Sequence, residues 1–255
     1  MTKSMRSLFL LLLLLSAACR SAVPPSQPAA PAVSAPAPAA AAAKPDPDSV
    51  KWVRESAEFR ALFVQVYRMA TVHVEAAART RAAGTWAVVL DADETVIDNS
   101  LHELERERQG GLPFTDEGWD AWVKRREATP LPGAGAFLSR VRALGGRIAI
   151  VTNRLQSQCA DTAAVFEKHG LVYDAMLCRP NGSPSDKNPR FEAVAAGTSP
   201  ASTSPLDVVA FVGDNIQDFP KLTQAVKAGG EAAFAEFGVR YFVLPNPMYG
   251  SWERP

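Results

Sequence analysis

The segment WAVVLDADET, residues 86–95, carries the two features on which the architecture of this 255-residue chain depends. Its first half is a short, continuously apolar run, which is typical of a strand buried on both faces of a parallel sheet. Its second half places Asp91, Asp93 and Glu94 where such a strand would end. Ligands of open parallel sheets bind just beyond the carboxyl ends of the strands. The segment therefore predicts both a central strand and the position of a functional site.

Four further apolar runs predict the rest of the sheet. They cover residues 147–152, 174–178, 208–212 and 239–244. Helical patterns lie before and between the runs, at residues 50–80, 133–144, 156–169, 190–196 and 216–228. Strands that alternate with helices are joined by right-handed crossovers. We therefore expect an α/β fold, a three-layer α/β/α arrangement around a doubly wound parallel sheet, within residues 48–255.

The first residues have the composition of a targeting signal. Basic residues precede an apolar run at residues 8–15, which is too short to span a membrane, and small residues lead up to Cys19. This layout predicts a signal peptide at residues 1–18. Because a Cys after small residues resembles a bacterial lipobox, we expect Cys19 to be lipidated. Ordinary signal-peptidase cleavage near Ala18 is the alternative.

Residues 19–47 continue from this Cys as a tether. Ala and Pro dominate the stretch, and such a composition favours an extended, semi-rigid chain without a core. A lipidated Cys followed by a tether would hold a folded domain near a membrane. We therefore expect an exported protein of the bacterial cell envelope, an outer-membrane lipoprotein that faces the periplasm or the cell surface.

Charge and cysteine content exclude several classes of protein. The chain has 27 Lys and Arg against 27 Asp and Glu, without a basic run, which argues against a nucleic-acid surface. Its three cysteines, Cys19, Cys159 and Cys178, are scattered and form neither a disulfide scaffold nor a zinc motif. Cys159 and Cys178 either form one disulfide or remain two buried thiols. The sequence does not indicate an oligomeric state.

Carboxylates also follow the strand predicted at residues 208–212. Asp214 and Asp218 should converge with Asp91 and Asp93 at one edge of the sheet. Buried like charges repel one another and lose solvation, so such a cluster requires a cation. A small set of oxygen ligands suits Mg²⁺, which usually takes a further oxygen from a substrate phosphate.

Other motifs for acidic or phosphate-binding sites do not match. A calcium loop that began at Asp91 would need Gly and Glu where the chain has Val96 and His102. The Gly-Lys-Ser/Thr of a nucleotide-binding P-loop does not follow any predicted strand, and the Gly-x-Ser-x-Gly of a hydrolase elbow does not occur.

Taken in order, four segments resemble motifs I to IV of the haloacid dehalogenase (HAD) superfamily. They are DADET at residues 91–95, TNR at 152–154, Lys187, and GDNIQDF at 213–219. The pair Trp119 and Trp122, the turn LPGA at 131–134 and the tail LPNPMYGSWE at 244–253 are similar to a narrower family. That family is the class C bacterial acid phosphatases, which include surface lipoprotein 5′-nucleotidases. The resemblance covers residues 50–255.

The resemblance implies a role for each motif. Asp91 would be the nucleophile that forms an aspartyl-phosphate, and Asp93 would be the general acid and then the base. Mg²⁺ would be held by Asp91, Asp93, Asp214 and Asp218. The phosphoryl oxygens would be bound by Thr152, Asn153 and Lys187. These roles predict a Mg²⁺-dependent acid phosphatase that hydrolyses phosphate monoesters.

Substrate choice would come from the insertion at roughly residues 96–130, which we expect to cover the site as a small helical cap. The resemblance implies that Phe114 and Tyr249 clamp a base or nicotinamide ring, and Trp119 belongs either to this lid or to the core. We expect nucleoside 5′-monophosphates or nicotinamide mononucleotide as substrates. A broad-specificity phosphatase is the alternative, because Leu101 and His102 stand where the family often has an aromatic residue. The same fold would also suit a non-catalytic surface-lipoprotein binding module, or a mutase or ATPase.

Overall fold

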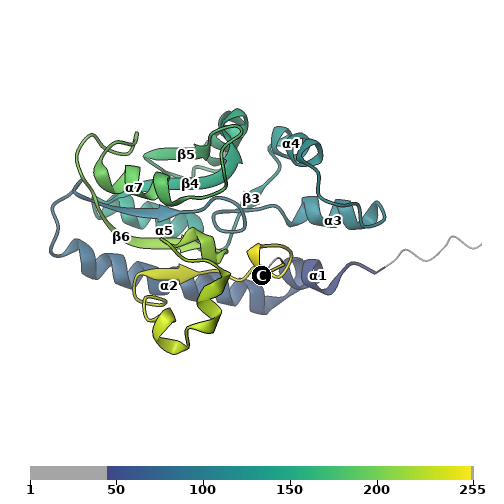
Figure 1. Ribbon diagram of the computed structural model, residues 1–255, viewed down its shortest axis with the longest axis horizontal. Helices are drawn as coiled ribbons and strands as arrows, with labels where there is room; N and C mark the ends of the chain where they lie inside the picture. The colour runs from purple at the N-terminus through teal and green to yellow at the C-terminus, as the bar shows by residue number, and fades with distance from the viewer. Residues whose placement is uncertain (1–44, 254–255) are drawn as a thin grey trace, which may run out of the picture. The chain divides into compact units, whose positions relative to one another are not determined.

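The computed structural model describes residues 45–253 (Figure 1). The predictions for the signal peptide, for Cys19 and for most of the tether lie outside these residues. None of the helices in the described part of the chain is long and apolar enough to cross a membrane.

Five parallel strands form the central sheet in the order β5-β4-β1-β6-β7 (Figure 1). Their bounds are Trp86–Leu90 for β1, Arg147–Leu155 for β4, Ala175–Arg179 for β5, Asp207–Gly213 for β6 and Tyr241–Val243 for β7. Strand β1 lies in the middle because both of its faces are apolar. Val88 and Leu90 join the core on one face, and Ala87 and Val89 join the core on the other. The predicted parallel α/β fold is confirmed.

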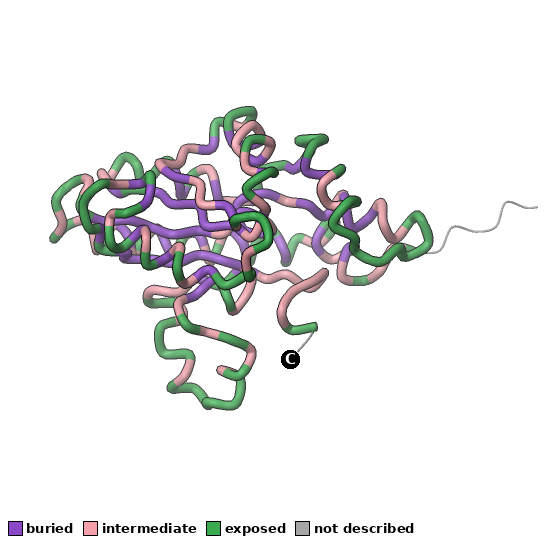
Figure 2. The backbone as a smooth tube through the Cα atoms, turned by 45° about the horizontal axis from the view of Figure 1, so that its top comes forward, coloured by how far each residue is buried: buried purple, intermediate pink, exposed green. Residues whose placement is uncertain are grey.

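Helices cover both faces of this sheet. The core on one face contains residues of α2 (Ala57–Ala78), α5 (Ala134–Ala143) and α6 (Cys159–Lys168), and α7 (Asn188–Ala196) covers the other face. Figure 2 shows the buried strands between these layers. The chain enters this fold through α1 (Asp48–Glu55).

The insertion between β1 and α5 forms a small unit of its own. Two short antiparallel strands, β2 (Ile97–Asp98) and β3 (Thr129–Pro130), pair at its base. Between them lie α3 (Ser100–Arg108) and α4 (Asp116–Arg125) (Figure 1), and α4 also contacts α6. We refer to α3, α4 and their connections, residues 99–128, as the cap.

The helix predicted over residues 216–228 is wrong. The chain instead forms two short 3₁₀ turns, Ile216–Asp218 and Gln224–Ala228. Pro220 explains the break, because a proline lacks the N–H that a helix interior needs and pushes the residue before it into extended geometry. Phe219 has φ −114° and ψ 139°, and its buried side chain contributes to the core. Further 3₁₀ turns lie at Gln156–Gln158, Glu231–Phe234 and Ser251–Glu253.

Cys159 and Cys178 form a disulfide, which settles the alternative that the sequence left open. Their Cα atoms lie 6.0 Å apart. The bond joins the first residue of α6 to strand β5. It therefore fixes the segment that follows β4 against the edge of the sheet.

Candidate active site

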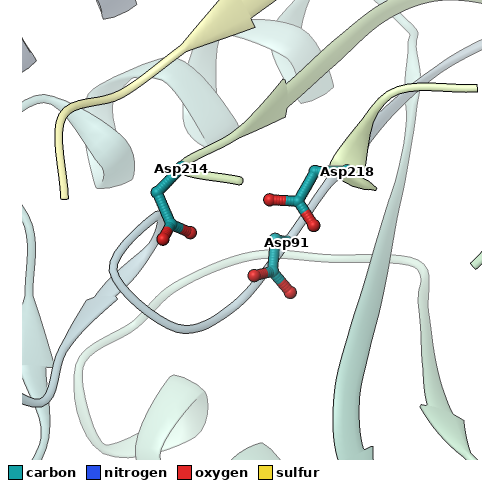
Figure 3. Close-up of side chains that lie close together, drawn as sticks. All are labelled: Asp91, Asp214 and Asp218. Carbon is teal, nitrogen blue, oxygen red and sulfur yellow. The ribbon is translucent and has the colours of Figure 1, made fainter. Parts of the chain in front are cut away.

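Three carboxylates meet at the carboxyl edge of the sheet. Asp91, Asp214 and Asp218 each bring one oxygen to within 4.8 Å of the others. Asp91 follows β1 and the other two follow β6, its neighbour in the sheet. Figure 3 shows the three carboxylates lying close together. Gly213 permits this approach, since a Cβ atom there would lie 2.3 Å from the Cβ of Asp218.

Lys187 places a buried ammonium group among these carboxylates. Its Nζ lies 2.7 Å from Oδ1 of Asp91 and 2.6 Å from Oδ1 of Asp218. Burial alone would lower the pKa of Lys187, but Asp218 and Asp91 outweigh it and raise the pKa. The side chain therefore remains charged among the carboxylates.

The charges of the cluster are not balanced by the protein. Burial raises the pKa of Asp91 to about 7; Lys187 opposes this rise, and Asp218 and Asp93 add to it. Burial, Asp218 and Asp91 likewise raise the pKa of Asp214. Oδ1 of Asp91 faces the ammonium of Lys187 but accepts a well-formed hydrogen bond from none of the described residues. A buried all-oxygen cluster in which three carboxylates meet a single ammonium group fits a divalent cation.

Asp93 lies beside this cluster in a different environment. Its Oδ1 accepts hydrogen bonds from Nη2 of Arg154 at 2.7 Å and from Nδ2 of Asn99 at 2.9 Å. Nε of Arg154 is shared between the two oxygens, at 2.9 Å from Oδ1 and 3.2 Å from Oδ2, and Oδ2 accepts no other bond from the described residues. One oxygen is thus held firmly and the other is left for a proton or a ligand.

A cavity of about 620 Å³ opens above these groups. From the sheet side it is lined by Asp91, Asp93, Asn153, Lys187, Asp214 and Asp218. From the cap and the tail it is lined by Phe114, Trp119 and Tyr249, among others. The structure therefore gathers nine of the ten residues predicted from the sequence for this site around one cavity.

Thr152 is the exception, because it does not line the cavity. Its side chain is fully buried, and its hydroxyl accepts a hydrogen bond from the backbone N–H of Arg154 at 3.1 Å. The two tryptophans of α4 also separate. Trp119 lines the cavity, whereas Trp122 is 2% exposed and belongs to the core.

Three polar residues of the site have roles that sequence reasoning missed. Arg154 and Asn99 hold Asp93, and Asn246 donates from Nδ2 to Oδ2 of Asp214 at 2.9 Å. Two of them lie in sequence segments that already resembled motifs of the family. Arg154 ends the TNR segment at residues 152–154, and Asn246 lies in the LPNP segment of the tail.

Comparisons with known proteins agree with this geometry. The family model described as HAD superfamily, subfamily IIIB (acid phosphatase) matches residues 15–252. The chain is 31% identical to the class C acid phosphatase from Bacillus anthracis, with a TM-score of 0.70 over 80% of this chain and 85% of that chain. A structure of the class C acid phosphatase from Bacillus anthracis with tungstate bound gives a TM-score of 0.69 at the same identity and coverage. The chain therefore belongs to the class C acid phosphatases of HAD subfamily IIIB, and it is a phosphomonoesterase.

Proposed function

We propose that this phosphomonoesterase depends on Mg²⁺ and transfers the phosphoryl group first to Asp91 and then to water. The observation that carries the proposal is the position of Asp91. Its carboxylate lies at the floor of the cavity, beside a buried ammonium group and within 4.8 Å of two further carboxylates. The ammonium of Lys187, and a cation held by the carboxylates, would supply the positive charge that this nucleophile needs, because an anionic phosphate and a carboxylate otherwise repel each other.

The reaction would proceed in two steps. An oxygen of Asp91 forms a bond to phosphorus while the bond from phosphorus to the ester oxygen breaks, and Asp93 donates a proton to that oxygen. A water oxygen then attacks phosphorus, Asp93 takes up a proton of that water, and the bond to Asp91 breaks to release phosphate. Oδ2 of Asp93 is the natural carrier of this proton, because Oδ1 already accepts from Arg154 and Asn99.

The remaining groups would bind the metal and the phosphate. Asp91, Asp214 and the backbone carbonyl of Asp93 would hold Mg²⁺, with Asp218 in support; the ion supplies positive charge between the carboxylates and the phosphoryl oxygens. Asn153 accepts from Nη2 of Arg190 at 2.6 Å through its Oδ1, which leaves its amide N–H groups for a phosphoryl oxygen. Lys187 would bind a second phosphoryl oxygen.

The upper part of the cavity supports a ring-bearing leaving group. Phe114, Trp119 and Tyr249 offer ring faces, on which a base or a nicotinamide ring can stack. The carboxylates of Glu103, Glu107 and Glu253 also line the cavity on the side of the cap and the tail, where Arg106 adds one guanidinium. This excess of negative charge favours nicotinamide mononucleotide, whose ring is cationic, over the neutral bases of nucleoside monophosphates.

Phosphate release from p-nitrophenyl phosphate and from a panel of mononucleotides, with Mg²⁺ and with EDTA, tests the metal and the substrate class. We expect turnover with Mg²⁺ and loss of turnover in EDTA; full activity in EDTA would refute the metal dependence. Asp91→Asn should abolish turnover, while Asp48→Asn, in α1 and outside the cavity, should leave it unchanged. Equal kcat/KM values across all monoesters would favour the broad-specificity alternative.

The preference for a cationic ring has its own test. The dihydro form of nicotinamide mononucleotide has nearly the same shape but a neutral ring. Because charges at a cavity rim contribute up to about 1 kcal/mol each, we expect the cationic form to be preferred by about threefold to tenfold. Replacing Glu107 and Glu253 together by Gln should reduce this ratio, and Glu58→Gln on α2 should not. An unchanged ratio in the double variant would refute the charge argument.

We also propose that the protein is exported and anchored through Cys19. The disulfide between Cys159 and Cys178 supports export, because structural disulfides persist mainly in oxidising compartments. Bacteria that express the chain should incorporate a radiolabelled fatty acid into it, and Cys19→Ser should remove the label. An unlabelled wild-type protein would reduce the anchor to an ordinary signal peptide.

A further inference from the structure

Asn99 carries a fully buried amide at the point where the chain passes from β2 into the cap. Asn99 is 0% exposed, and its side chain uses both of its polar atoms. Its Nδ2 donates to Oδ1 of Asp93 at 2.9 Å and to Oε2 of Glu94 at 3.1 Å. Its Oδ1 accepts from Nε1 of Trp122 at 2.8 Å and from Nη2 of Arg154 at 3.0 Å. One side chain thus connects a core residue of the cap to the carboxylate of Asp93.

Arg154 makes a second connection of the same kind. Its buried guanidinium binds Asp93 through Nη2 and Nε, and its Nη1 donates to the hydroxyl of Thr162 on α6 at 3.1 Å. The same guanidinium lies over the ring of Trp119, 5.2 Å from the ring centre. Trp119 and Trp122 both belong to α4. Asp93 is therefore joined to one helix of the cap through both Asn99 and Arg154.

We infer that Trp122, Asn99 and Arg154 are positioning residues, which orient the carboxylate of Asp93 toward the ester oxygen. The position of α4 would thus determine the orientation of the general acid. The inference rests on the proposed role of Asp93. A carboxylate turns about two single bonds, and three donors on Oδ1 fix both of them. Displacing a reacting group by about 1 Å can lower a rate by about 100-fold. A cap that only covered the cavity would need no such bonds to Asp93.

The leaving group distinguishes positioning from a purely structural role. Phenyl phosphate and p-nitrophenyl phosphate have nearly the same shape, but only phenolate needs a proton to leave readily. The value of kcat/KM reports the first chemical step alone, in which Asp93 acts as an acid. A wrongly oriented general acid should therefore lower kcat/KM for phenyl phosphate and leave kcat/KM for p-nitrophenyl phosphate nearly unchanged.

Trp122→Phe is the first variant, because it keeps an aromatic ring in the core and removes the N–H that holds Asn99. We expect kcat/KM to fall about tenfold or more for phenyl phosphate and less than about twofold for p-nitrophenyl phosphate. Trp86→Phe is the matched control, since Trp86 is equally buried and its Nε1 has no hydrogen-bond partner in the described chain. Equal losses on both substrates would overturn the inference.

Two further variants separate this inference from the proposed function. Arg154→Lys keeps the positive charge but cannot bind both Asp93 and Asn99 through one planar group, so it should show the same dependence on the leaving group. Asp93→Asn removes the acid itself and should show a stronger dependence. If Asp93→Asn shows none, the proposed role of Asp93 fails. If kcat/KM depends on the leaving group in Asp93→Asn but not in Trp122→Phe, only the positioning by the cap is refuted.

Discussion

Replacing Lys187 by Met should destabilise the metal-free enzyme by several kcal/mol. The substitution keeps most of the side-chain length but removes the charge that lies 2.7 Å from Asp91 and 2.6 Å from Asp218. At an effective dielectric constant of about 20, two unit charges at that separation attract by about 6 kcal/mol, and desolvation of both groups offsets part of this. Removing one partner of a buried ion pair typically costs about 3–5 kcal/mol. For a domain of this size, that loss corresponds to a fall in Tm of about 6–20 °C.

Thermal unfolding in EDTA, followed by circular dichroism, measures this effect. Lys227→Met is the matched control, because Lys227 is exposed and should leave Tm unchanged. Added Mg²⁺ should stabilise Lys187→Met more than the wild type, since the cluster then carries one more uncompensated negative charge. A Lys187→Met protein that melts in EDTA within about 2 °C of the wild type would refute the argument that this ammonium group stabilises the buried carboxylates.

Three other perturbations follow from the packing and electrostatics. Gly213→Ala should destabilise the protein by about 1–3 kcal/mol and lower its affinity for Mg²⁺ in a calorimetric titration, because the new Cβ would lie 2.3 Å from a carboxylate side chain of the cluster. Reducing the disulfide, or replacing Cys159 and Cys178 together by Ser, should lower the free energy of unfolding by about 3 kcal/mol, and the two treatments should give the same Tm. Burial lowers the pKa of His102 from 6.5 to about 4, so folding favours its neutral form. Stability from this group should be complete above pH 6.5 and be lost progressively as the pH falls toward 4, and His102→Gln should have a flatter profile in denaturant titrations.

The sequence predicts the sheet and the edge of the sheet that carries the site. Short apolar runs such as residues 86–90 and 208–212 have few structural alternatives, and parallel strands align their carboxyl ends. This alignment is why Asp91 and Asp214 could be placed together although they lie far apart in the chain. The predicted helix over residues 216–228 does not form, because Pro220 interrupts the apolar pattern and two short 3₁₀ turns take its place.

The polar connections of the site were harder to predict, because they depend on tertiary contacts. Asn99 is one of many polar residues in the insertion, and its bonds with Trp122 and Arg154 join residues that lie far apart in the chain. The two tryptophans of α4 looked equivalent in the sequence, yet one lines the cavity and the other is buried in the core. Burial of a given side chain depends on which face of α4 meets the sheet domain, and that face is not visible in a three-residue spacing.

The short ladder of β2 and β3 also bears on how such enzymes diversify. It pairs Ile97 with Pro130 and Asp98 with Thr129, so the two ends of the insertion lie side by side. A lineage can in principle exchange the whole cap here without changing the sheet, and thereby acquire new substrates. Asn99 restricts that freedom, because a transplanted cap without this amide and an indole to meet it would leave the general acid loosely held. New specificities should therefore arise more readily by substitutions at the cavity mouth than by cap exchange.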